Sequence, residues 1–324
     1  WLSYGIAQSL QQEYTAAMES YDRAIEINAN YDPAWYERGN ALAALGRHES
    51  AIVNFDRVME IVPNFHPAIQ AKGQSLFKLH RYPEAIASYD LALELEPNRS
   101  DLWCQRGDAY THLAQWEVAL NSYQKALNID ATSVSAWYAQ GKTLRQLPHY
   151  PAALDSYDRA LKLNPEDYCI WNNHGNLLGS LKRYESAIES YQRALDLQPQ
   201  FYQSWHNLGK ALFHLKRYEE AAAAHEQSLE IHPHDAHAWN SRGIALQQLH
   251  RWQAALVCYE RSTEIDPQDS LTWLNRGIAL FHLQKYADAI ACYDNCADLN
   301  PDDSQVYHQR GNALIELGQW EDAV

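Results

Sequence analysis

Apolar residues recur three or four positions apart in short runs, as in AWYERGNALAAL (residues 34–45) and SAIVNFDRVMEI (residues 50–61). This spacing places apolar side chains along one face of an α-helix. A short polar segment separates the two runs, and the same pair returns along the whole chain. The pattern therefore predicts an all-α protein made of amphipathic helix pairs.

Glycine marks the length of the repeating unit. Ten of the 13 glycines are spaced 34 residues apart, without insertion or deletion. They are Gly5, Gly39, Gly73, Gly107, Gly141, Gly175, Gly209, Gly243, Gly277 and Gly311. A fixed period of this size is typical of a solenoid whose units stack on their neighbours. We therefore expect residues 1–324 to form one array with no internal domain boundary.

Other residue types keep the same register. Alanine stands twelve positions after each glycine, from Ala17 through Ala187 to Ala323, and aromatic residues stand nine and sixteen positions after it in most repeats. Proline follows twenty-four positions after it in seven repeats. Tryptophan precedes it by four positions at Trp1, Trp35, Trp103, Trp137, Trp171, Trp205, Trp239 and Trp273.

This combination resembles the tetratricopeptide repeat (TPR) over the whole chain. The resemblance implies an all-α, right-handed superhelical solenoid of 34-residue helix–turn–helix repeats. It divides the chain into a partial repeat at 1–31, full repeats at 32–65, 66–99, 100–133, 134–167, 168–201, 202–235, 236–269 and 270–303, and a partial repeat at 304–324. Second helices such as RYESAIESYQRAL (residues 183–195) resemble those of bacterial, notably cyanobacterial, arrays.

Each recurring residue type has an expected structural role. Glycine within a helix costs about 1 kcal/mol relative to alanine, so its return in every repeat indicates a close helix–helix contact. We expect the alanine twelve positions later to provide the matching small surface, and the tryptophans and other aromatic residues to form the core. Asp32 and Pro33 predict a helix N-cap followed by a first-turn proline. Gly46 and Gly318 are predicted to end first helices in the left-handed conformation.

Composition narrows the classes of function. The net charge of −15 disfavours nucleic acid and anionic membranes as partners, and no apolar run approaches the ~20 residues of a membrane span. Five cysteines form no disulfide framework, which favours a reducing, cytoplasmic compartment. No phosphate loop, nucleophile elbow or metalloprotease motif is present, so we expect neither an enzyme nor a cofactor. His232, His234 and His237 cluster at a predicted turn, where exposure to solvent is favoured over zinc binding and metal binding stays open.

The remaining first-helix positions are the candidate binding surface. In TPR proteins the concave face, which the first helices line, usually binds the partner. The candidate residues on this face are Tyr36, Asn40, Tyr138, Lys142, Arg145, Asn172, Asn173, Asn176, His206, Asn207, Lys210, Asn240 and Asn275. Lys142, Arg145 and Lys210 make the middle of the predicted groove basic, which suits a partner with an acidic patch.

A row of asparagines suggests how the predicted groove binds a peptide. Asn173, Asn207 and Asn275 share the position two residues before the repeat glycine, and each carboxamide can donate and accept at once. This row resembles the asparagine ladder in the repeat domain of O-GlcNAc transferase, which implies an extended peptide held by its main chain. Ser241 interrupts the row. The carboxylate clamp of chaperone-binding TPR proteins has no match.

The sequence therefore predicts a scaffold that binds a protein or an extended peptide. Because the chain starts inside a first helix at Trp1 and stops within a second helix at Val324, we expect a piece of a longer protein. An alternative is a regulatory module for a kinase, ATPase or protease domain outside this segment. A purely architectural, self-assembling array is a third possibility, and the oligomeric state is left open.

Overall fold

The computed structural model describes residues 1–321 and is all-α over that range, as predicted. Its helices fall into two compact units, Trp1–Pro165 and Glu166–Val324. The first unit contains α1 (Leu2–Leu10), α2 (Tyr14–Ile27), α3 (Asp32–Ala44), α4 (His48–Ile61), α5 (His66–Lys78), α6 (Tyr82–Leu95), α7 (Ser100–His112), α8 (Trp116–Ile129), α9 (Val134–Gln146) and α10 (Tyr150–Leu163). The second contains α11 (Tyr168–Ser180), α12 (Tyr184–Leu197), α13 (Tyr202–His214), α14 (Tyr218–Ile231), α15 (Ala236–Gln248), α16 (Trp252–Ile265), α17 (Ser270–His282), α18 (Tyr286–Leu299) and α19 (Ser304–Glu316). The repeat alanine Ala323 lies outside the described residues.

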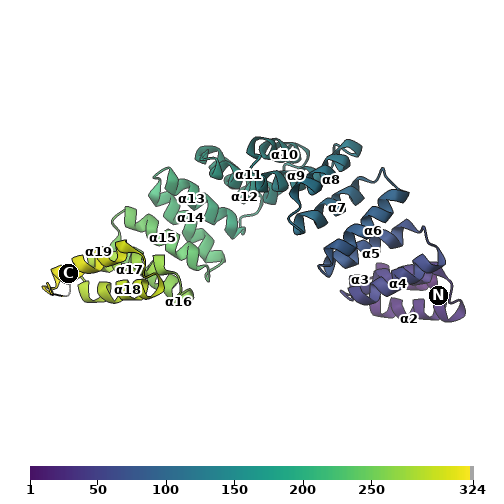
Figure 1. The fold of residues 1–324 in the computed structure, drawn as a ribbon, viewed down its shortest axis with the longest axis horizontal. Coiled ribbons are helices and arrows are strands. Elements are labelled where there is room, and N and C mark those ends of the chain that lie inside the picture. Colours follow the sequence, from purple (N-terminus) through teal and green to yellow (C-terminus); the bar gives the residue numbers. More distant parts are fainter. Residues whose placement is uncertain (322–324) are drawn as a thin grey trace. The chain divides into compact units, whose positions relative to one another are not determined.

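Each unit is a two-layered stack of helices. Within a unit, every helix packs against the next one in the chain (Figure 1). Odd-numbered helices also contact the next odd-numbered helix, whereas the even-numbered helices of residues 1–321 make no such contact with one another. The odd-numbered helices therefore form the inner layer of each unit, and the even-numbered helices form the outer layer.

The repeat glycines lie where a first helix meets the aromatic ring of its own second helix. A Cβ atom at Gly39 would lie 2.5 Å from Cε1 of Phe55, and one at Gly175 would lie 2.7 Å from Cε1 of Tyr191. Carbon atoms cannot pack this closely, so the predicted close approach is confirmed from Gly5 through Gly277. The nearest atoms belong to the ring sixteen positions later, which the sequence prediction did not name as the partner of the glycine. The alanine twelve positions later is buried, as at Ala51 and Ala187.

Seven repeat tryptophans are half-buried, whereas Trp1 is exposed. Trp35, Trp103 and Trp137 pack against clusters of buried residues, so the core prediction holds for the tryptophans only in part. Six of their indole N–H groups each donate to the backbone carbonyl six residues earlier, at 2.9 Å. A buried indole needs an acceptor for this N–H, and the turn between repeats supplies one. The tryptophans therefore fasten each turn to the following first helix. The core prediction is confirmed for the aromatic rings that cover the glycines, of which Tyr21, Tyr157 and Tyr259 are fully buried.

Every turn between a first and a second helix contains one residue in the left-handed conformation. Gly46 (φ 74°) and Gly318 (φ 75°) adopt it, as predicted. The other repeats place residues with a side chain there, at Gln12, His80, Ala114, Pro148, Lys182, Lys216, His250 and Gln284. A Cβ atom raises the energy of this conformation by roughly 1–2 kcal/mol. These eight turns therefore carry backbone strain that the two glycine turns lack.

The strain at Ala114 predicts a stabilising substitution. Ala114→Gly removes the Cβ atom at a backbone φ of 55°. We expect the free energy of unfolding to rise by about 0.5–1 kcal/mol, because part of the relieved strain is offset by the greater freedom of glycine in the unfolded chain. Urea denaturation measures the change. The reciprocal variant Gly46→Ala, whose new Cβ would meet no atom within 4 Å, is expected to lower stability by a similar amount; a gain there would contradict the strain argument.

Helix α3 begins at Asp32, one residue earlier than the sequence predicted, because Asp32 was expected to be the N-cap and Pro33 the first helical residue. The residue before Asp32, Tyr31, occupies the N-cap position without a side-chain hydrogen bond, and Asp32 and Pro33 lie within the first turn. In five later repeats the equivalent of Tyr31 is a capping residue whose side-chain oxygen accepts from the helix N-terminus: Ser133, Asp167, Asp235, Asp269 and Asp303. These caps satisfy amide groups that a helix leaves unpaired.

Candidate functional site

A pocket opens on the inner layer of the second unit, between α11, α12 and α13. Its volume is about 300 Å³, and its lining includes Asn176, Gly179, Asn207 and Lys210. Gly179 holds the position that phenylalanine holds at Phe77, Phe213 and Phe281. A Cβ atom at Gly179 would contact only the hydroxyl of Tyr191, at 3.6 Å. The missing side chain therefore helps to create the pocket.

Three polar side chains present different groups to this pocket. Asn176 accepts a hydrogen bond from the Tyr191 hydroxyl at 2.9 Å, so its Nδ2 group is left to donate. Asn207 donates from Nδ2 to Asn172 at 3.2 Å, so its Oδ1 atom is left to accept. Lys210 is exposed and makes no ion pair among residues 1–321. The pocket thus offers a donor, an acceptor and a cation together.

Aromatic rings form the walls of the pocket. Tyr184 and His214 stack with ring centroids 4.6 Å apart and an interplanar angle of 11°, and Tyr191 lies behind the amide of Asn176. The sequence prediction missed these residues and Gly179. Gly179 carried a usable signal, because it is one of three glycines outside the 34-residue period.

A pocket with the equivalent lining occurs in the first unit, between α7, α8 and α9. Each of its nine lining residues stands 68 positions before its counterpart in the second unit, and its volume is about 260 Å³. Lys142 corresponds to Lys210, but Asp108 takes the place of Asn176. Asp108 accepts from the Tyr123 hydroxyl at 2.7 Å, and burial raises the pKa of its carboxyl group. A carboxylate at this point suits an anionic ligand less well than the amide of the second unit.

Three predicted groove asparagines do not project into open space. Asn172, Asn240 and Asn275 are buried between neighbouring first helices. Asn275 donates to Asn240 at 3.2 Å, and Asn172 accepts from both Asn207 and Ser204. A buried amide needs such partners, so these side chains link successive repeats. The expectation that they are exposed to a ligand is wrong.

The other predicted residues are spread over both units. In the first unit, Asn40 donates weakly to Glu37 at 3.4 Å, and the Lys142 ammonium lies 4.6 Å from the ring centroid of Tyr138. The Tyr36 ring packs edge-on against Phe65.

Arg145 lies half-buried on α9 in the same unit. In the second unit, Asn173 donates to the carbonyl of Cys169 at 2.9 Å, and the His206 ring packs against His225. Of the predicted set, the structure therefore brings Asn176, Asn207 and Lys210 together in one pocket.

Metal and membrane chemistry find no support in residues 1–321. No group of three or more His, Cys, Asp and Glu side chains in that range could hold a metal ion. His232, His234 and His237 are exposed, and the His232 ring stacks on Tyr202. No described helix is both long and apolar enough to cross a bilayer.

The thiols of Cys258, Cys292 and Cys296 are buried, as expected. Burial raises the pKa of the Cys258 and Cys292 thiols to about 11. They are therefore protonated, unreactive core groups.

Solved structures with a similar fold are numerous. The C-terminal part of a TPR repeat-containing protein from Cytophaga hutchinsonii matches with a TM-score of 0.63 and 18% identity, over 73% of this chain and 97% of that one. PilF of Pseudomonas aeruginosa matches with a TM-score of 0.56 and 21% identity, over 69% and 97% of the two chains. The APC/C hetero-tetramer Cut9–Hcn1 matches with a TM-score of 0.55 and 16% identity, over 94% and 60%. A comparison with curated proteins finds no match.

Family models agree with these structures. Models of the tetratricopeptide repeat match residues 10–46, 32–65, 67–99, 107–147, 138–200, 172–236 and 250–310. These segments cover most of the chain and fall on the helix pairs described above. The chain therefore belongs to the tetratricopeptide repeat family and folds as an all-α TPR solenoid.

Proposed function

We propose that this protein is an interaction scaffold, and that the inner pocket of its second unit holds an extended peptide with an acidic side chain. The observation that carries the proposal is the set of unused hydrogen-bonding groups on Asn176, Asn207 and Lys210 around one open pocket. Amide groups at a pocket surface that are not used within the protein are available for recognition.

An extended peptide satisfies the two amides together. Its backbone N–H donates to Oδ1 of Asn207, and a backbone carbonyl accepts from Nδ2 of Asn176. Asn172 holds the Asn207 carboxamide in place from behind, at 3.2 Å. Because this pairing reads the main chain, it depends little on peptide sequence.

Lys210 adds a preference for acidic side chains. Its ammonium group is exposed at the pocket rim, and an acidic residue of the peptide would gain a charge-assisted hydrogen bond there. The asparagine row is shorter than the sequence prediction, because Asn275 is buried. Main-chain recognition in the second unit therefore rests on Asn176 and Asn207.

A phenylalanine at position 179 tests this proposal. Gly179→Phe restores the residue found at Phe77, Phe213 and Phe281, so the fold is expected to persist while the side chain fills the pocket. Peptides selected from a random display library on the wild-type protein are expected to lose at least about tenfold in affinity for the variant, since they lose two main-chain hydrogen bonds. Fluorescence anisotropy with the selected peptides measures this.

Two further variants serve as controls for the blocked pocket. Gly179→Ala adds one methyl group at an ordinary contact distance of 3.6 Å from the Tyr191 hydroxyl and is expected to change the affinity by less than about threefold. Lys210→Gln is expected to reduce the enrichment of Asp and Glu in the selected peptides. Unchanged affinity in Gly179→Phe would place peptide binding on another surface.

A further inference from the structure

A ladder of ion pairs joins successive repeats on the outer side of the molecule. A basic residue directly before a repeat glycine pairs with an acidic residue on the second helix of the preceding repeat. The pairs are Arg38–Asp22 (2.7 Å), Lys72–Asp56 (2.6 Å), Arg106–Asp90 (2.6 Å), Arg276–Glu260 (3.7 Å), Arg310–Asp294 (2.6 Å) and Arg242–Glu226. Each interface in the ladder thus buries part of one cationic side chain between two outer helices.

The interface between α8 and α9 lacks this cation. Gln140 takes the basic position and Gln124 the acidic one, and Nε2 of Gln140 donates to Oε1 of Gln124 at 3.4 Å. Oε1 of Gln140 accepts from the Ser156 hydroxyl at 3.1 Å. In the ladder pair of the preceding repeat, the equivalent serine, Ser122, accepts from the Arg106 guanidinium. This interface therefore keeps the serine that contacts the guanidinium, although both the guanidinium and its carboxylate partner are replaced by neutral amides.

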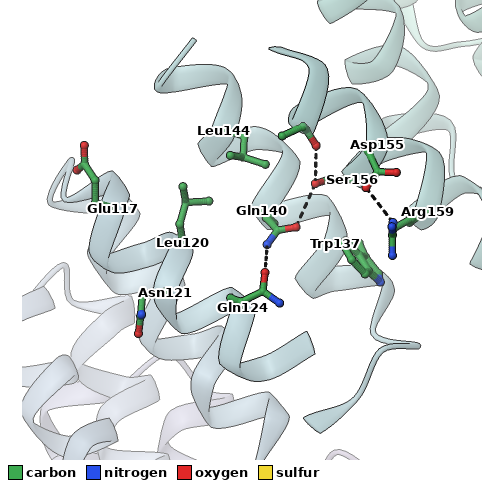
Figure 2. A pocket seen from close by; sticks show the side chains of 11 residues that line it. Glu117, Leu120, Asn121, Gln124, Trp137, Gln140, Leu144, Asp155, Ser156 and Arg159 are labelled. Atoms are coloured by element: carbon green, nitrogen blue, oxygen red, sulfur yellow. Dashed lines mark hydrogen bonds and ion pairs between the residues drawn. The ribbon is translucent and has the colours of Figure 1, made fainter. Parts of the chain in front are cut away.

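A cavity of about 640 Å³ opens at this interface (Figure 2). Gln124, Gln140 and Ser156 line it, and Figure 2 shows their hydrogen-bonded chain crossing the space between the helices. Leu120 and Leu144 form apolar walls at one side. Amide and hydroxyl oxygens beside an apolar wall suit a cation carried on an aliphatic stem.

The lining carries a net negative charge. It contains two carboxylates, Glu117 and Asp155, and one guanidinium, Arg159. Asp155 and Arg159 pair with each other at 2.9 Å. Glu117 is exposed and forms no ion pair within residues 1–321. One carboxylate at the cavity is thus left for an incoming cation.

The Trp137 ring contacts one cation where the equivalent ring of the preceding repeat contacts two. In the preceding repeat the Trp103 ring contacts two cations, Lys125 at 4.2 Å and Arg106 at 5.5 Å from its centroid. Arg159 corresponds to Lys125 and lies 4.7 Å from the centroid of Trp137. The position that corresponds to Arg106 is occupied by the shorter, neutral Gln140.

We propose that this outer cavity binds the guanidinium side chain of an arginine supplied by a protein partner. The guanidinium would donate to the Gln124 and Gln140 amide oxygens, while its aliphatic stem packs on Leu120 and Leu144. Glu117 would attract it as the unpaired carboxylate of the lining. The site lies on the outer layer and is independent of the peptide pocket. The scaffold would thus have a second binding site, which prefers a basic side chain, whereas the peptide pocket prefers an acidic one.

Arginine model compounds test the site directly. The probe is N-acetyl-arginine N-methylamide, followed by NMR on the isotope-labelled chain, with the neutral citrulline analogue as its control. We expect saturable shifts of the Trp137 indole and the Gln140 side-chain amide with arginine only. The double variant Gln124→Glu/Gln140→Arg installs the ion pair of the six ladder interfaces and fills the cavity. It is expected to abolish these shifts while the melting temperature stays equal or rises.

Two results would overturn the proposal: equal binding of citrulline, or arginine binding that survives in the double variant. Glu117→Gln decides the question if the double variant does not fold, because it changes only an exposed charge. That variant is expected to lower the affinity for the arginine probe about two- to fivefold, which is the effect of one exposed charge pair. An unchanged affinity in Glu117→Gln would count equally against the site.

Discussion

Gly175→Ala is expected to lower the free energy of unfolding of the second unit by roughly 2 kcal/mol. The new Cβ atom would lie 2.7, 2.9 and 3.1 Å from three ring carbons of Tyr191. That ring is buried and its hydroxyl is bonded to Asn176, so it cannot move aside without further loss. Overpacking of this kind costs about 1–3 kcal/mol, which the better helix propensity of alanine offsets only in part. Urea denaturation followed by circular dichroism measures the change.

Gly179→Ala is a matched control on the same helix. Its Cβ atom would meet the same tyrosine at an ordinary contact distance of 3.6 Å, so the propensity gain of up to about 1 kcal/mol is expected to remain. Hydrogen exchange should locate the effect of Gly175→Ala in α11 and α12, because a solenoid is stabilised by contacts between neighbours. Equal stability changes in the two variants would show that the glycine–tyrosine contact does not set the requirement for glycine.

The periodic residues made the fold predictable. A glycine that returns every 34 positions despite its cost had to serve a packing need, and that need is visible at each Gly–aromatic contact. The identity of the partner was not predictable, because both an alanine and an aromatic residue follow every glycine at fixed offsets. The half-burial of tryptophan was missed for a similar reason. The apolar pattern predicts that the Trp35 side chain is buried, whereas its indole N–H donates to the backbone carbonyl of Ala29 in the turn, and the side chain is only half-buried.

The candidate site was predictable only in part. The period of 34 identifies which residues lie on first helices, but side chains of neighbouring first helices meet at an offset of 35, as Asn172 does with Asn207 and Asn240 with Asn275. Each pair therefore uses amide groups to join two repeats. A prediction that considers each repeat position separately does not detect this hydrogen bond and treats both amides as available to a ligand. The pocket itself depends on a missing side chain at Gly179, and a search for chemically active residues overlooks such a feature.

Histidine at position 225 is expected to make the second unit sensitive to acid. His225 fills the position that tyrosine or phenylalanine holds in the other repeats, and it covers Gly209 in a site where only 1% of its surface is exposed. Burial, together with the neighbouring His206, Lys210 and Arg242, lowers the pKa of this imidazole to about 3. The His206 ring lies 5.1 Å away, and burial also lowers its pKa.

The direction of the pH effect follows from proton binding in the two states. An unfolded histidine binds a proton below about pH 6.5, whereas His225 in the folded protein stays neutral until about pH 3. The contribution of His225 to the free energy of unfolding is therefore fully present above about pH 6.5. As the pH is lowered below this value, the free energy of unfolding decreases by up to about 1.4 kcal/mol per pH unit. We expect a loss of about 2 kcal/mol between pH 7.5 and pH 5.0 that His225→Tyr removes, since tyrosine does not titrate in this range. Urea midpoints of both proteins at the two pH values measure the difference, with His225→Phe as the control for the added hydroxyl. Parallel losses in wild type and both variants would assign the acid sensitivity to other groups, of which the half-buried His206 is the nearest.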